Sequence, residues 1–273
     1  MIDLIVSQGR VADRAGKMIE GAARIANAME HRYGVKGRVI GEPAPPAEDD
    51  WSTSLPQARD TLTRLGEEVT QSVRANGTLT VLVNNTCSVS LATLPRVARE
   101  HPEAVILYID GHGDFNTPAT TDTGYLGGMV LAAACGRWNS GHGDGVRSEQ
   151  AVLVGARDID AGELQLLSEA RVRVIGPEEA TPENVLRAID GAPVWIHIDW
   201  DVLEPGYVPA DYAVPGGMLP TQLKAVLEAI PAEHIIGIEM AEFNATEDEA
   251  INSQAVEIVL DTVGPVLEAR RTQ

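Results

Sequence analysis

Ala104-Val-Ile-Leu-Tyr-Ile109 runs directly into Asp110-Gly-His-Gly-Asp114, so an apolar segment of strand length ends in carboxylates and an imidazole. Val194-Trp-Ile-His-Ile198 runs in the same way into Asp199-Trp-Asp201. In an extended chain, residues at i, i+2 spacing point to one side. Because ligands bind at the carboxyl ends of strands in open α/β sheets, the two segments predict one shared polar site.

Strand-like and helix-like segments alternate along the chain. Apolar runs of strand length lie at 2–6, 79–83, 104–109, 151–154, 171–175, 194–198 and 234–238. Segments of helical period lie between them, at 11–29, 57–73, 181–189, 221–229 and 251–268. This alternation predicts a mainly parallel sheet covered by helices on both faces, a three-layer α/β/α fold. No Pro- or Gly-rich stretch separates two self-sufficient halves, so we expect a single catalytic domain over residues 1–273.

Composition excludes several classes of partner. The formal net charge of −19 argues against nucleic acid and anionic membranes, because phosphate binding relies on Lys and Arg. No apolar run approaches the roughly 18 residues that a membrane span needs. The apolar start contains Asp3 and is too short for a signal-peptide core, so we expect a cytoplasmic protein in which Cys87 and Cys135 are reduced thiols.

The polar residues at the two strand ends suit a pair of hard cations. Mn²⁺ prefers carboxylate and imidazole ligands, and two ions roughly 3.5–4 Å apart lower the pKa of a shared water. Asp110 and Asp199 are placed to bridge such ions, and His112, Asp114 and Asp201 are placed as terminal ligands. The pattern predicts a two-metal hydrolase.

At these residues the chain resembles the arginase and agmatinase (ureohydrolase) family. The family pattern D-x-H-x-D is met by Asp110, His112 and Asp114, and D-x-D is met by Asp199 and Asp201. Glu242, in Glu239-Met-Ala-Glu242, is similar to the substrate-side glutamate of the family. The resemblance covers about residues 80–245. It implies an arginase-like fold, a dimanganese centre and hydrolysis of a guanidino group.

The resemblance also implies a role for each of these residues. It implies two overlapping ligand sets: Asp110, Asp114, Asp199 and one upstream residue for the first ion, and His112, Asp110, Asp199 and Asp201 for the second. Asp114 would also align the attacking hydroxide. Glu242 would hold the guanidino nitrogens.

A second group resembles the substrate contacts of arginases. Asn116, Thr121 and Thr123 are similar to the segment that grips the α-carboxylate, and Asp160 is similar to the aspartate that meets the α-amino group. A site built to pair polar groups rejects analogues that lack them, since its own groups would stay unpaired. We therefore expect a small guanidino amino acid as the substrate, rather than decarboxylated agmatine.

This sequence departs from the family at two positions. Most ureohydrolases have an upstream histidine ligand where this chain has Cys87, in Asn84-Asn-Thr-Cys87-Ser88. A thiolate is softer than imidazole and suits manganese poorly, so either the first ion is bound more weakly or Cys87 lies beside it without coordinating.

The other departure is Gly127, where arginases have a histidine assigned to proton shuttling. Loss of this histidine should penalise arginine, because its guanidinium is strongly basic and its amine is a poor leaving group. Both departures are similar to those of ureohydrolases that convert Nω-hydroxy-L-arginine to L-ornithine and hydroxyurea in D-cycloserine biosynthesis. The resemblance therefore implies an N-hydroxyguanidine substrate, which is less basic and carries its own hydroxyl.

Several alternatives stay open at this point. The substrate could be L-arginine or a related guanidino compound. Cys87 could be a nucleophile with His112 as its base, or the chain could be a binding protein that has lost a metal. His197 could line the site or be a core histidine. We expect a monomer or a small homo-oligomer.

Overall fold

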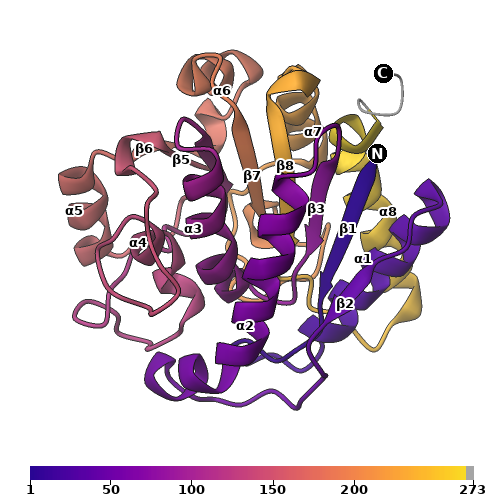
Figure 1. Ribbon diagram of the computed structural model, residues 1–273, viewed down its shortest axis with the longest axis horizontal. Helices are drawn as coiled ribbons and strands as arrows, with labels where there is room; N and C mark the ends of the chain where they lie inside the picture. The colour runs from indigo at the N-terminus through magenta and orange to yellow at the C-terminus, as the bar shows by residue number, and fades with distance from the viewer. Residues whose placement is uncertain (269–273) are drawn as a thin grey trace.

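A parallel sheet runs through the molecule (Figure 1), and the computed structural model describes residues 1–268. Eight strands are ordered β2-β1-β3-β8-β7-β4-β5-β6, and every neighbouring pair is parallel. The strands are β1 Ile2–Ser7, β2 Arg38–Ile40, β3 Leu79–Val83, β4 Val105–Ile109, β5 Ala151–Val154, β6 Arg173–Ile175, β7 Val194–Asp199 and β8 Ile235–Ala241.

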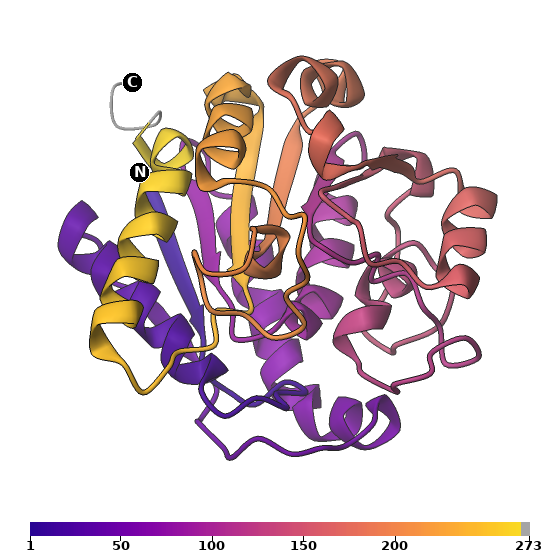
Figure 2. The same cartoon turned by 180° about the vertical axis from the view of Figure 1, so that it is seen from behind.

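Helices cover both faces of this sheet. They are α1 Met18–Tyr33, α2 Trp51–Val73, α3 Ser90–Glu100, α4 Val130–Ala134, α5 Ala161–Ala170, α6 Pro182–Ile189, α7 Pro220–Ala229 and α8 Glu249–Glu268. α2 and α3 lie in front of the sheet in Figure 1, whereas α7 and α8 lie in front in the reverse view of Figure 2. The prediction of a three-layer α/β/α fold is confirmed.

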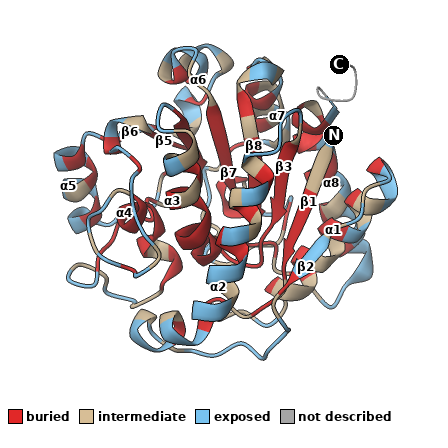
Figure 3. Cartoon of the chain, in the orientation of Figure 1, coloured by how far each residue is buried: buried red, intermediate tan, exposed pale blue. Residues whose placement is uncertain are grey.

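Two apolar cores explain why the central strands are continuously hydrophobic. In β4, Leu107 and Ile109 pack in the core that contains residues of α1, α6, α7 and α8. Ile106 and Tyr108 point the other way, into the core that contains residues of α2, α3, α4 and α5. All of β4 is buried (Figure 3), as expected for a strand covered on both faces.

The predicted strands all occur, but β2 was missed. Arg38–Ile40 is a short edge strand, and Arg38 and Val39 are exposed, so it has no buried apolar run for the sequence to reveal. The helices at 90–100 and 161–170 were also missed. The prediction of a helix over 11–29 was wrong at its start, because α1 begins at Met18.

Long-range contacts explain the late start of α1. Asn85 Nδ2 donates to the Asp13 carboxylate at 2.7 and 2.8 Å, and Thr86 Oγ1 donates to Val11 O at 2.7 Å. Ala12 has a φ of 65°, which no α-helix allows. The segment before α1 is thus held against the end of β3.

Within residues 1–268, no helix combines the length and apolar character needed to cross a membrane.

Candidate active site

Four neighbouring strands end in the polar residues that the sequence singled out. Cys87 follows β3 after a short loop, Glu242 follows β8, Asp199 ends β7 and Asp110 follows β4. These strands are consecutive in the sheet, in the order β3-β8-β7-β4. The parallel topology therefore brings residues far apart in sequence to one edge of the sheet.

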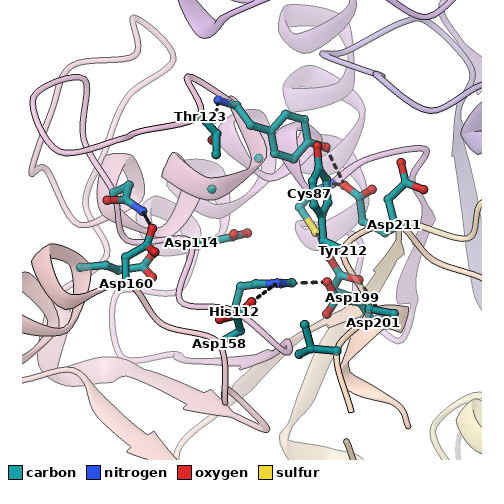
Figure 4. Close-up of a pocket in the computed structure, with 18 residues that line it drawn as sticks. Cys87, His112, Asp114, Thr123, Asp158, Asp160, Asp199, Asp201, Asp211 and Tyr212 are labelled. Atoms are coloured by element: carbon teal, nitrogen blue, oxygen red, sulfur yellow. Dashed lines mark hydrogen bonds and ion pairs between the residues drawn. The ribbon is translucent and has the colours of Figure 1, made fainter. Parts of the chain in front are cut away.

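Backbone N–H groups hold the carboxylates of this edge in place. Asp110 Oδ1 accepts from His112 N at 2.7 Å, Asp201 Oδ1 accepts from Gly111 N at 2.9 Å, and Asp199 Oδ1 accepts from Asp201 N at 2.8 Å. His112 Nδ1 lies 2.8 Å from Asp201 Oδ2, as the dashed line in Figure 4 shows. Each aspartate has one oxygen fixed by the backbone, which leaves the second oxygen for another partner.

The packing of acidic groups is electrostatically unfavourable without a cation. Burial, together with the neighbouring carboxylates, raises the pKa of Asp199 and of Asp114 well above the ordinary value. The same causes raise the pKa of Asp201 to about 6. Burial alone would lower the pKa of His112, but hydrogen bonds to Asp110 and Asp201 outweigh it and raise that pKa to about 12.

The donor atoms fit metal ions. Asp110 Oδ2 is buried and accepts no hydrogen bond. Three groups have ligand atoms within 4.8 Å of one another: Cys87, Asp110 and His197; Cys87, Asp199 and Glu242; and Asp110, His112 and Asp201. An orphaned carboxylate oxygen among further carboxylates and an imidazole is the environment that hard divalent cations require. Among residues 1–268, no Lys or Arg lines the cavity to neutralise these charges instead.

Cys87 lies between this cluster and a buried polar network. Its Sγ donates to Asp199 Oδ2 at 3.1 Å and lies 3.3 Å from His197 Nε2. Burial, followed by the charges of Asp199 and Glu242, raises the pKa of the thiol. Before a cation binds, Cys87 is therefore a protonated thiol and a poor nucleophile.

His197 lies behind Cys87, in contact with residues that the sequence did not single out. Its Nδ1 lies 3.1 Å from both Glu239 Oε1 and Ser90 Oγ, and Thr93 Oγ1 donates to Glu239 Oε2 at 2.7 Å. The only sequence signal for Glu239 was an acidic residue inside an apolar strand. His197 is thus both a core histidine and a neighbour of the site.

Glu242 presents one occupied and one free oxygen. Its Oε1 accepts from Cys87 N at 2.7 Å and from the Tyr125 hydroxyl at 3.2 Å. Its Oε2 is buried and has no hydrogen-bond partner. Burial, opposed by the hydrogen bond from Cys87, raises the pKa of Glu242 to about 8. A cationic N–H donor would satisfy Oε2 and favour the carboxylate form.

A cavity of about 400 Å³ opens over these groups. Among the predicted substrate residues, Asn116, Thr123 and Asp160 line it, and Asn116 Nδ2 donates to Asp160 Oδ2 at 3.4 Å. Thr121 is not in the lining, and its hydroxyl accepts from Gly124 N at 3.0 Å. A direct contact between Thr121 and a substrate stays a prediction.

Further lining residues were not predicted as site residues. Asp158 lies in the same loop as Asp160, between β5 and α5, and Asp211 comes from the loop between β7 and α7 (Figure 4). The full lining is Cys87, His112, Asp114, Asn116, Thr123, Tyr125, Gly127, Gly128, Asp158, Asp160, Glu163, Asp199, Asp201, Asp211, Tyr212, Ala213, Val214 and Glu242. The aromatic side chains Tyr125 and Tyr212 carried no motif, so only the folded chain reveals them.

The parallel sheet, the convergent carboxylates and the buried orphan oxygens define a metal-dependent hydrolase. The Arginase family model matches residues 12–264, and the chain belongs to the arginase family. It is 69% identical to an N(omega)-hydroxy-L-arginine amidinohydrolase of Streptomyces lavendulae, over 98% of each chain. It is 27% identical to an arginase of Brevibacillus brevis over 70% of each chain.

Solved structures agree with this assignment of the fold. An arginase from Bacillus cereus has a TM-score of 0.83 at 24% identity, covering 97% of both chains. An Entamoeba histolytica arginase in complex with L-ornithine has a TM-score of 0.84 at 20% identity, covering 97% of this chain and 98% of the other. The predictions of the family and of a metal-dependent amidinohydrolase are confirmed.

Proposed function

We propose that the protein hydrolyses Nω-hydroxy-L-arginine to L-ornithine and hydroxyurea. The observation that carries the proposal is the 69% identity to the Streptomyces lavendulae amidinohydrolase, over 98% of each chain. The cavity wall supports it, because Gly127 offers no side chain for proton transfer. An N-hydroxyguanidine is less basic than a guanidine and carries its own hydroxyl for hydrogen bonding or proton transfer.

We propose two Mn²⁺ ions as the cofactors. Their ligands would be Asp110, Asp114, Asp199 and Cys87 for one ion, and His112, Asp110, Asp199 and Asp201 for the other. The orphaned Asp110 Oδ2 and the oxygen-rich donor set support hard cations at this edge. When bound, such a pair supplies Lewis-acid activation of water near neutral pH.

In this proposal, protein groups would orient the substrate by its two ends. The free Oε2 of Glu242 would accept a guanidino N–H, which relieves an unsatisfied buried oxygen. Asn116, Thr123 and Asp160 would hold the amino-acid end, with Asp160 facing the α-amino group. Fixing both ends presents the guanidino carbon in one orientation and lowers the entropic cost of reaction.

We propose that Asp114 accepts the proton of the attacking water. The Tyr108 hydroxyl donates to Asp114 Oδ2 at 2.6 Å and fixes the orientation of this carboxylate. Water oxygen joins the guanidino carbon, the bond from that carbon to Nδ breaks, and the proton goes to the amine of ornithine.

We also propose the oligomeric state, the compartment and the biosynthetic role of the protein. We propose that residues 1–273 act as one catalytic domain, as a monomer or small homo-oligomer in the cytoplasm. The family resemblance in the two departures, Cys87 and Gly127, supports a role in supplying hydroxyurea for D-cycloserine.

The test is a side-by-side kinetic comparison with Mn²⁺ supplied. We expect kcat/KM to be highest for Nω-hydroxy-L-arginine, above L-arginine, agmatine and guanidinobutyrate, with hydroxyurea and L-ornithine detected by mass spectrometry. Protein stripped by a chelator is the control and should be inactive until Mn²⁺ is restored. A preference for L-arginine would contradict the proposal.

A further inference from the structure

The Tyr125 ring occupies the space beside Gly127 in the cavity wall. A Cβ atom at Gly127 would lie 2.4 Å from Tyr125 Cε1, 2.9 Å from Cζ and 3.1 Å from the phenol oxygen. Contacts of 2.4 Å are far inside van der Waals distance, so a side chain at 127 would force this ring to shift. Gly127 is absent from the residues with positive φ, so its backbone does not demand glycine. The glycine makes room for the phenol.

The ring is held in this position from two sides. The guanidinium of Arg14 lies over it at 5.0 Å from the ring centroid, and the Tyr212 ring lies at 5.5 Å. Arg14 is itself anchored, because Nη2 donates to Asp49 O at 2.8 Å and to Thr123 O at 3.1 Å. A phenol fixed in this way is preorganised and loses little entropy when it binds a ligand.

The hydroxyl of Tyr125 has a defined hydrogen-bond role. It donates its single proton to Glu242 Oε1 at 3.2 Å. The phenol oxygen then keeps its lone pairs and can only accept from a ligand in the cavity. The free Oε2 of the same glutamate lies ready for a guanidino N–H. An acceptor beside the guanidino-binding oxygen matches a substrate that carries an O–H on the guanidino nitrogen.

We propose that Tyr125 is the specificity-determining residue that recognises the N-hydroxyl group of the substrate. The phenol oxygen accepts a hydrogen bond from that hydroxyl, and Gly127 is the space that permits the phenol to be there. The inference rests on the proposed function, since it names the contact by which that substrate is distinguished from an unhydroxylated guanidine.

The first experiment compares Tyr125→Phe with the native protein, both loaded with Mn²⁺. We expect kcat/KM for Nω-hydroxy-L-arginine to fall about tenfold, the effect of one hydrogen bond. The Ki of L-ornithine, which has no guanidino group, should stay unchanged. The residual kcat/KM for L-arginine should fall by a smaller factor, since Glu242 loses only the hydrogen bond from the phenol. Tyr207→Phe, a substitution of an exposed tyrosine outside the cavity, is the matched control.

A merely structural role would give a different result. If Tyr125 only supports the fold of the cavity, Tyr125→Phe will alter the hydroxylated and unhydroxylated substrates and the Ki of L-ornithine by the same factor, which overturns the inference. Native protein that fails to turn over Nω-hydroxy-L-arginine would instead refute the proposed function itself. The two failures are therefore distinguishable.

A double-mutant cycle tests the link to Gly127. Gly127→Ala should displace the ring and reduce kcat/KM for Nω-hydroxy-L-arginine as much as Tyr125→Phe does. If both substitutions act through the phenol, kcat/KM for Nω-hydroxy-L-arginine should fall no further in the double variant than in either single variant. The two effects would then be strongly non-additive. Simple multiplication of the two losses would overturn the role assigned to this pair.

Discussion

Cys87 Sγ lies 3.3 Å from His197 Nε2, and the opposite ring nitrogen of His197 lies 3.1 Å from Glu239 Oε1. The imidazole is also stacked on Tyr108, with ring centroids 4.0 Å apart. Burial alone would raise the pKa of Glu239, but hydrogen bonds led by His197 lower it, so Glu239 is a carboxylate. A buried Cys–His–Glu chain thus fixes the position of a sulfur beside the carboxylate cluster.

This relationship predicts that His197→Phe weakens metal binding. Phenylalanine keeps the stacking on Tyr108 but removes the hydrogen bonds that orient Cys87. Loss of such a supporting contact typically costs about 10–100-fold in metal affinity. Elemental analysis after dialysis should show less than two metals per chain, whereas the control His142→Phe, outside the cavity lining, should keep the native content. Full metal content in His197→Phe would refute this role.

Metal removal and thiol alkylation should separate the two chemical routes. Cys87 is 2% exposed, so iodoacetamide should leave activity intact in the folded enzyme. Chelation should abolish activity, and added Mn²⁺ should restore it. Activity that survives chelation but is lost on alkylation would establish Cys87 as the nucleophile instead.

Asp110→Asn should abolish metal uptake and activity together. The side-chain oxygen of asparagine can still accept from His112 N, so we expect the fold to persist. The amide nitrogen would replace the orphaned Oδ2 and cannot bind a cation. Activity and elemental analysis report the two losses, and circular dichroism reports the fold. Asp144→Asn, in the loop after α4, is the matched control, and full activity in Asp110→Asn would end the metal proposal.

Glu163 should make the metal-free protein less stable as pH rises. Burial raises its pKa from 4.5 to about 7, although Phe115 N donates to Oε1 at 2.7 Å. Between pH 4.5 and 7 the folded state binds more protons than the unfolded state, so stability falls as pH rises. The titration of Glu163 lowers the free energy of unfolding by about 3 kcal/mol, and this loss is complete above pH 7.

The check is a series of Tm measurements on chelated protein between pH 4.5 and 8. In Glu163→Gln the fall in Tm should be shallower than in the native chain, because the remaining slope comes from the other buried carboxylates and from His112, whose pKa is also raised. Equal slopes in the two proteins would show that Glu163 does not titrate in this range.

Asp160→Asn should weaken binding of the α-amino group. Asparagine keeps the shape and the contact to Asn116 but loses the charge that pairs with an ammonium. We expect KM for Nω-hydroxy-L-arginine and the Ki of L-ornithine to rise about tenfold, the loss of one charge-assisted hydrogen bond. The Ki of 5-aminovalerate, which lacks the α-amino group, should not change. Equal changes for both inhibitors would contradict the assignment.

The substrate end of the cavity could be read only in part from local sequence. Asn116, Thr123 and Asp160 were found by resemblance and do line the cavity. Thr121 lies outside the lining, since its hydroxyl is used inside its own turn. Turn chemistry and ligand binding draw on the same residue types, so spacing does not distinguish them.

The sequence by itself determined the central strands and the acidic residues that end them. Both depend on neighbours a few positions away: a run of buried apolar residues predicts β4 and β7, and each run passes directly into acidic residues. Such local patterns are visible in one chain because they repeat with the period of the strand. The extended i, i+2 geometry expected for Asp199 and Asp201 was wrong, because Trp200–Val202 forms a 3-10 turn in which Asp199 Oδ1 accepts from Asp201 N.

Only the tertiary structure decided which further groups reach the site. His197 with Glu239, and Tyr125 with Glu242, meet through contacts that depend on strand order and on loop packing. The same holds for the late start of α1, which is fixed by Asn85 and Thr86 from the end of β3. These contacts join residues far apart in sequence, and their free energy comes from burial and hydrogen bonding that exist only once the sheet has assembled.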